Sequence, residues 1–311
     1  MTLGRSGACG SWVVASATGH PLLIDGYSSA IASSLSKSPS AASKTPPSRC
    51  GKSMAGKLNG NRSMAATVVD ARAIEGPTHR QREHRFFWGM SVLIALIVFI
   101  GFARTYFLAG FFHAKPLPAP IVHIHGAVFT SWIVLLVMQT SLAASGRPDI
   151  HRRLGIAGLA LAPCVAVLGI LVANEMLRRT WAIPRFDAAA IYAVALSEIL
   201  GFTVPVASAF RLHRNPAFHK RLILIGTIAM MTAGFGRWPV HFLLHKPLPA
   251  MMGTFGLLLL LTLYDLLSMR RIHPATALGG FWVVFIELMA IAVGHTAGWH
   301  RLADYIHSAG V

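Results

Sequence analysis

From Phe86 to its carboxyl terminus, the chain is a succession of long apolar runs. Each run holds about 20 residues, the length that crosses roughly 30 Å of hydrocarbon as a helix. Unpaired backbone cannot lie in lipid, and the runs lack the period-two alternation of a membrane β-barrel. The sequence therefore predicts an all-α, polytopic membrane helix bundle with seven transmembrane helices, at about residues 87–110, 121–143, 153–175, 188–210, 221–243, 251–268 and 275–296.

The charged residues are few and unevenly placed. They make up 13% of the chain, whereas a soluble domain carries about 25%. The net charge of +17 does not indicate a nucleic-acid partner, because the basic residues lie in a polar tail and in short loops. Twelve basic residues flank the spans on the face where the first span begins, and six lie on the other face. This asymmetry predicts a bacterial inner-membrane protein with a cytoplasmic amino terminus, an external carboxyl terminus and anionic lipid at the cytoplasmic face.

Residues 1–85 are rich in Ser, Ala, Gly and Pro and are too polar to bury a core. We expect this segment to be disordered, or to be an extension upstream of a true translation start at Met54 or Met64. An organelle transit peptide is the alternative, because Asp25 is the single acid among the first 69 residues. The transmembrane domain is then residues 86–311.

Two motifs recur in the same order. The segment GFAR at Gly101–Arg104 precedes KPLPA at Lys115–Ala119, and GFGR at Gly234–Arg237 precedes a second KPLPA at Lys246–Ala250. We predict a tandem duplication of three helices separated by the fourth, with candidate repeats at 86–176 and 219–297. Convergence of proline-rich turns is the alternative. The three-plus-one-plus-three arrangement resembles that of the SWEET transporters, whose repeats are related about the membrane normal.

Several histidines are expected near the outer face. The segment H-I-H-G at His123–Gly126 opens the second span, and its two histidines share one metal only if the first helical turn is irregular. Neutral imidazoles from several helices bind zinc or iron, or hold a haem b between helices. The alternative is that these rings lie at the lipid headgroups without a ligand. The candidate cofactor ligands are His123, His125, His241, His245 and His295, with His123, His125 and His241 as the candidate metal ligands.

The histidines expected at the inner face have basic neighbours. His151, His219 and His273 lie beside Arg152, Lys220 and Arg271. Adjacent positive charge favours binding of lipid phosphate or a role at a helix start. A second layer of haem ligands is the alternative.

Two carboxyl groups fall within predicted spans. Glu198 lies near the middle of the fourth span and Glu287 near the middle of the seventh. A carboxylate at that depth costs a few kcal/mol in lipid, so each should face the bundle interior. Arg104 and Arg237, the arginines of the repeated motifs, are the expected partners. These four intramembrane polar residues are candidates for a proton or substrate pathway, and a purely structural ion pair is the alternative.

Other polar residues have a structural explanation. We expect Asp265 to pair locally with Arg270 and Arg271, about one turn away. We expect interhelical packing and hydrogen bonds from Trp132, Gln139 and Thr140.

An ordered set of motifs extends from the second span to the seventh. It comprises H-x-H-G and W-x-x-L-x-x-x-Q-T within His123–Thr140, D-x-H-R-R-L-G at Asp149–Gly155, H-K-R-L at His219–Leu222, and Y-D-L-L and R-R-x-H-P-A within Tyr264–Ala275. This set resembles a family of uncharacterised bacterial multi-pass membrane proteins, which implies the fold but no activity. Histidines spread over several helices are also similar to those of dihaem membrane cytochromes b and ferric reductases, which implies haem binding.

Three functions follow as hypotheses. The histidines favour a haem- or metal-binding membrane protein of redox or electron-transfer function. The repeat and the intramembrane charges favour a transporter of a small solute, an ion or protons. A metal-dependent membrane hydrolase would need a carboxylate or hydroxyl near the outer histidines, and the sequence offers none. Whether the protein is an enzyme stays open.

Overall fold

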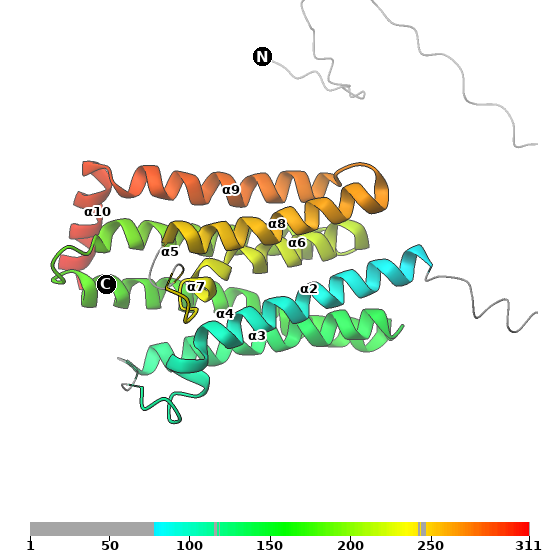
Figure 1. The fold of residues 1–311 in the computed structure, drawn as a ribbon, viewed down its shortest axis with the longest axis horizontal. Coiled ribbons are helices and arrows are strands. Elements are labelled where there is room, and N and C mark those ends of the chain that lie inside the picture. The colour runs from blue at the N-terminus through cyan, green and yellow to red at the C-terminus, as the bar shows by residue number, and fades with distance from the viewer. Residues whose placement is uncertain (1–77, 115–116, 118, 242, 244–246, 311) are drawn as a thin grey trace, which may run out of the picture. The chain divides into compact units, whose positions relative to one another are not determined.

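The computed structural model describes residues 78–114, 117, 119–241, 243 and 247–310. The predicted extension at 1–85 lies outside this part except for its last residues, as do Lys115 and Lys246 of the two KPLPA loops. The described residues form helices and no strand, which confirms the all-α bundle (Figure 1). The helices are α2 (His79–Phe102), the π-helix η1 (Ala103–Phe107), α3 (Pro120–Ala144), α4 (Pro148–Thr180), α5 (Ala188–Arg211), α6 (Pro216–Ala229), α7 (Met231–Phe235), α8 (Pro247–Met269), α9 (Pro274–Gly294) and α10 (Ala297–Ser308).

Six of the described helices are long and apolar enough to cross a membrane: α2 with η1, α3, α4, α5, α8 and α9. Their outward faces are strongly apolar, and Ile156, Leu267 and Leu278 expose 70%, 80% and 69% of their surface. Soluble monomers rarely expose so much contiguous apolar surface. The chain is therefore an integral membrane protein.

The fifth predicted span, 221–243, is not one continuous helix. It consists of α6, with 14 residues, and α7, with five, and the break is at Met230. The Met230 N–H donates to the Thr227 carbonyl at 3.2 Å, three residues back, which interrupts the α-helical pattern. Helix α7 ends at Phe235, well before residue 243. The count of seven transmembrane helices is therefore not confirmed.

Helix α5 lies at the centre of the bundle. It packs against α4, α6 and α9, and these neighbours run alongside it (Figure 1). Its small residues, among them Ala193 and Gly201, are buried, which allows the surrounding backbones to approach. Phe202 of α5 joins Ile94, Ile225 and Leu261 in the largest hydrophobic cluster.

Helix boundaries in the bundle follow ordinary capping chemistry. Thr78 and Gln81 form a capping box at the start of α2. The Asp187 side chain accepts from the Ala190 N–H at 2.9 Å at the start of α5. Pro120, Pro148, Pro216 and Pro274 occupy first-turn positions, where proline is favoured.

The bundle has two ends that differ in the connections they hold. The basic end holds the start of α2 and the α3–α4, α5–α6 and α8–α9 connections, and the far end holds the α4–α5 connection and α10 (Figure 1). The sequence did not predict α10, which lies across the far end against α4, α5 and α9. Trp299 fixes it there, because its indole N–H donates to the Ala189 carbonyl at 2.7 Å.

The matched glycines of the two repeated motifs meet at the contact between α2 and α7. A Cβ on Gly101 would lie 2.3 Å from the Gly234 carbonyl oxygen, so the two backbones touch. The Trp238 indole N–H donates to the Ile97 carbonyl at 3.2 Å across the same contact. In a protein made of two symmetric repeats, equivalent residues contact each other only near the symmetry axis. The Gly101–Gly234 contact is therefore the kind that a duplication would produce. The duplication itself stays a prediction.

This contact predicts a sharp difference between two glycines of one helix. Gly101→Ala should lower the free energy of unfolding by about 1–3 kcal/mol, because the added methyl overlaps backbone that cannot rotate away. Gly89→Ala should leave stability unchanged or raise it by about 0.5–1 kcal/mol, since nothing lies within 4 Å of that position. Thermal unfolding of the purified protein in detergent measures both, and equal melting temperatures for the two variants would contradict the contact.

Candidate functional site: an intramembrane carboxyl cluster

Glu287, near the middle of α9, is the most unusual polar residue of the bundle. It is 1% exposed, and neither carboxyl oxygen has a hydrogen-bond partner among the described residues. A buried carboxylate without a partner costs several kcal/mol in an apolar medium. The site therefore favours the neutral acid, or a carboxylate that a bound cation neutralises.

A second carboxyl group lies close to Glu287. Glu198 of α5 is half-buried and lies within electrostatic range of both Glu287 and the Arg237 guanidinium. The two carboxyl groups come from helices that pack side by side, α5 and α9. The burial of Glu287 agrees with the prediction that it faces the bundle interior, whereas Glu198 is only half-buried.

Arg237 follows the end of α7 and approaches this cluster from the far end. Its Nη1 donates to the Ala233 carbonyl at 2.7 Å, and its guanidinium lies 4.8 Å from the centre of the Phe102 ring. It is within electrostatic range of Glu198, but no ion pair joins it to either glutamate among the described contacts. The expected Glu287–Arg237 ion pair is therefore absent from those contacts.

Arg104 does not reach the carboxyl cluster. It lies in η1, is exposed, and places its guanidinium 5.6 Å from the centre of the Phe112 ring. No ion pair joins Arg104 to Glu198 or Glu287 among the described residues, so the expected partnership with an intramembrane glutamate is not seen there.

His125 of α3 extends the cluster toward the far end. Its ring is nearly parallel to that of Phe129, with 6.2 Å between the ring centres. Its Nδ1 is buried without a partner among the described residues. It lies within electrostatic range of Arg237. His125, Arg237, Glu198 and Glu287 thus come from four parts of the fold, and each lies within electrostatic range of the next in that order.

The other predicted cofactor ligands are dispersed. Helix α3 starts at Pro120, so His123 and His125 lie on a helix and do not share a face. His123 is exposed beside Tyr106, with 6.0 Å between the ring centres. His241 is exposed in a turn beyond α7, and His245 lies outside the described residues. His295 is exposed, with its Nδ1 2.8 Å from the Ile291 carbonyl oxygen.

Within the described ranges, no group of three or more His, Cys, Asp or Glu side chains is placed to hold a metal ion. The described part of the chain therefore does not bring His123, His125 and His241 together as a metal site. Because His245 lies outside it, haem or metal binding by the outer histidines stays a prediction.

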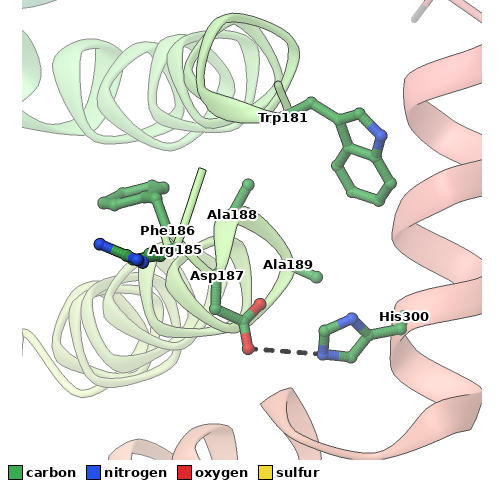
Figure 2. Close-up of a pocket in the computed structure, with 7 residues that line it drawn as sticks. All are labelled: Trp181, Arg185, Phe186, Asp187, Ala188, Ala189 and His300. Atoms are coloured by element: carbon green, nitrogen blue, oxygen red, sulfur yellow. Dashed lines mark ion pairs between the residues drawn. The ribbon is translucent and has the colours of Figure 1, made fainter. Parts of the chain in front are cut away.

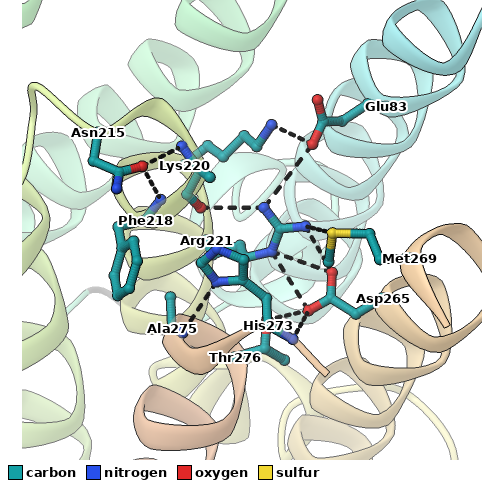
Figure 3. A network of polar contacts seen from close by, with 11 residues as sticks. Glu83, Asn215, Phe218, Lys220, Arg221, Asp265, Met269, His273, Ala275 and Thr276 are labelled. Atoms are coloured by element: carbon teal, nitrogen blue, oxygen red, sulfur yellow. Dashed lines mark hydrogen bonds and ion pairs between the residues drawn. The ribbon is translucent and has the colours of Figure 1, made fainter. Parts of the chain in front are cut away.

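A second polar cluster lies at the basic end, around a buried ion pair (Figure 3). Arg221 of α6 and Asp265 of α8 are 1% and 0% exposed, and the Arg221 Nη2 donates to Asp265 Oδ1 at 2.7 Å. Asp265 also accepts from the Thr276 hydroxyl at 2.6 Å and the His273 N–H at 3.2 Å. The predicted pairing of Asp265 with Arg270 and Arg271 is wrong, because α8 turns this carboxylate inward and both arginines are exposed.

The same network reaches α2 and the start of α9. Glu83 of α2 forms an ion pair with Lys220 and lies 3.9 Å from Arg221 (Figure 3). His273 caps α9, with its Nδ1 accepting from the Ala275 N–H at 3.1 Å. Burial lowers the pKa of His273, and the nearby Arg221 lowers it further, so its Nδ1 stays free to accept. This confirms the helix-start role predicted for His273. The network clamps α2, α6, α8 and α9 together.

The predicted interhelical hydrogen bonds of α3 are confirmed. The Trp132 indole N–H donates to the Thr227 hydroxyl at 3.1 Å, and the Gln139 amide donates to the His151 carbonyl at 3.1 Å. The Thr140 hydroxyl lies 2.8 Å from that of Ser91. Sequence reasoning missed the buried Arg221 and its half-buried neighbour Glu83 as members of this network. The H-K-R-L motif was the available signal, because all three of its polar residues turn out to be engaged.

An open pocket of about 390 Å³ lies at the far end, between the α4–α5 connection and α10 (Figure 2). Trp181, Phe186 and the buried Ala188 and Ala189 supply its apolar surface. Asp187 supplies a carboxylate whose Oδ2 lies 3.5 Å from His300 Nε2. The Asp187 side chain is also the cap of α5, so its position has a structural cause.

The buried ion pair predicts a large cost for removing one partner only. Asp265→Asn should lower the free energy of unfolding by about 3–5 kcal/mol, because Arg221 keeps its charge without a carboxylate. The double variant Arg221→Met with Asp265→Leu should recover most of that loss. Asp304→Asn, at an exposed position, is the matched control and should change little. Thermal unfolding in detergent provides the comparison, and a double variant no more stable than Asp265→Asn would contradict this account.

Comparison of the whole chain with protein-family models, curated proteins and solved structures finds no match.

Proposed function

We propose that the protein is a membrane transporter of protons or a small cation, in which Glu287 and Glu198 bind the transported or coupling ion. The observation that supports this most directly is the Glu287 carboxyl group, buried at mid-helix with both oxygens unpartnered among the described residues. Retaining such a group costs stability, and ionisable residues of this kind inside a membrane mark proton and ion pathways.

The neighbours of Glu287 fit the same function. Glu198 supplies a second carboxyl oxygen donor, and Arg237 and His125 are polar groups on the far-end side of the pair. Carboxylate oxygens suit hard cations such as protons, Na⁺ and Li⁺. A break at Met230 separates α6 from α7, and α7 ends at Phe235, just before Arg237. Broken helices next to a charged site are typical of secondary transporters.

The orientation of the pathway follows from the charge bias of the loops. We place the basic end in the cytoplasm and the far end outside, in a bacterial inner membrane, with anionic lipid at the basic end. The Arg237 and His125 side of the cluster then faces outward. Electron transfer through haem or a metal at the outer histidines is the other hypothesis from the sequence, and no contact among the described residues favours it over transport.

Carbodiimide labelling tests the proposed ion site without knowledge of a solute. Dicyclohexylcarbodiimide reacts with protonated carboxyl groups in apolar surroundings, so it should modify the Glu287 peptide, and bound Na⁺ or alkaline pH should protect it. Asp304, exposed on α10, should stay unlabelled. Mass spectrometry of the digested protein identifies the site. Glu287 left unmodified at acidic pH would argue against it.

Transport itself is tested in proteoliposomes. Under an imposed proton or Na⁺ gradient, the wild type should dissipate the gradient, and Glu287→Gln should reduce the rate at least about tenfold, because the amide cannot exchange a proton. Asp304→Asn should keep the wild-type rate. A rate that is the same with empty liposomes, or that Glu287→Gln leaves unchanged, would contradict the proposal.

A further inference from the structure

Two histidines from different helices lie next to each other at the basic end. His151 is in the first turn of α4 and His219 in the first turn of α6, and their ring centres lie 6.5 Å apart with planes at 84°. Each belongs to a motif that the carboxyl cluster does not use, D-x-H-R-R-L-G and H-K-R-L. Both side chains are half-buried.

Both rings are held in the same way. His151 Nδ1 lies 3.3 Å from the Gln139 carbonyl oxygen, and His219 Nδ1 lies 2.9 Å from the Ala209 carbonyl oxygen. A carbonyl oxygen only accepts, so each Nδ1 is the atom that carries the hydrogen. The lone pair of each neutral imidazole is then on Nε2. An Nδ1–H bound to a backbone carbonyl is the arrangement that orients metal-binding histidines.

Neither Nε2 is used by the fold. No hydrogen bond or ion pair engages His151 Nε2 or His219 Nε2 among the described residues. Neither atom is among the buried polar atoms that lack a partner, so each is accessible from solvent. The Nδ1 hydrogen bonds alone are enough to link neighbouring helices. The free Nε2 lone pairs therefore have no structural role in the described part of the chain.

We propose that His151 and His219 together bind one copper(II) ion through their Nε2 atoms. Two imidazoles that share a metal at about 2 Å have ring centres roughly 5–6.5 Å apart, depending on the angle at the metal. The observed separation of 6.5 Å lies at the wide end of that range and requires ligands on nearly opposite sides of the ion. Square-planar copper(II) accepts two imidazoles in that arrangement, whereas tetrahedral zinc does not, and copper(II) also binds most tightly among the divalent ions.

Water or His213 completes the coordination. His213 follows α5, is within electrostatic range of His219, and also has its Nδ1 on a carbonyl oxygen, that of Phe210 at 2.7 Å. It is exposed, and the three histidines are not grouped as a preformed three-ligand site. The site therefore has two protein ligands in place. It is separate from the outer histidines and from the carboxyl cluster, and it does not depend on the proposed transport.

Metal titration of the full chain tests the site. Protein purified in detergent without a histidine tag is stripped with chelator, incubated with Cu²⁺, and passed through gel filtration. Elemental analysis should find one ion per chain in the wild type. The electron paramagnetic resonance spectrum of the Cu²⁺ form should show splitting from imidazole nitrogen.

Single substitutions assign the ligands. His151→Ala and His219→Ala should each weaken binding at least about 100-fold, because one of two protein ligands is lost. His84→Ala, in α2 at the same end, should bind like the wild type. The ion should also raise the melting temperature of the wild type but not of the two ligand variants, while gel filtration shows that these remain folded. No retained metal in the wild type, or affinity unchanged in folded His151→Ala and His219→Ala, would overturn the proposal.

Discussion

Hydrocarbon supplies no partner for a charge, and this constraint explains both what holds the bundle together and where its chemistry lies. At the basic end the constraint is satisfied: Arg221 and Asp265 are almost completely buried, and each has several hydrogen-bond partners from its neighbours. In the middle of α9 it is not, because both oxygens of Glu287 lack a partner among the described residues. The fully partnered Arg221–Asp265 pair is typical of a structural ion pair. The unpartnered Glu287 is typical of a group that binds an exchangeable ligand. The contrast between them supports a functional role for Glu287.

The broken α6–α7 segment connects these two clusters. Arg221 lies in α6 and Arg237 just beyond α7, so one segment carries the clamp at the basic end and the arginine beside Glu198. Its break at Met230 lies between them, and its contact with α2 is made through glycine backbones that leave no room for side chains. Any movement of α7 relative to α6 would change the surroundings of the carboxyl pair without breaking the buried ion pair.

Much of this could be predicted from the sequence, and the failures have physical causes. The helices that cross the membrane follow directly from hydropathy, and the inward placement of Glu287 follows from the cost of a carboxylate in lipid. The break at Met230 could not be predicted, because no proline or glycine marks it. The sequence places Asp265 near Arg270 and Arg271, whereas its partner Arg221 is 44 residues away and only packing brings the two together. Helix α10 was missed because it is short and carries Arg301 and Asp304 among apolar residues. Arg104 lies in a π-helix, for which the sequence gives no recognisable signal.

The central claim is that Glu287 is a carboxyl group that exchanges a proton or a cation inside the membrane. Infrared difference spectroscopy of the reconstituted protein between acidic and alkaline pH measures this directly, because a protonated carboxyl group in apolar surroundings has a carbonyl stretch distinct from that of a carboxylate. We predict a pH-dependent protonated-carboxyl band that Na⁺ or alkaline pH removes and that is missing in Glu287→Gln. A difference spectrum without such a band, or one that Glu287→Gln leaves unchanged, would contradict the account.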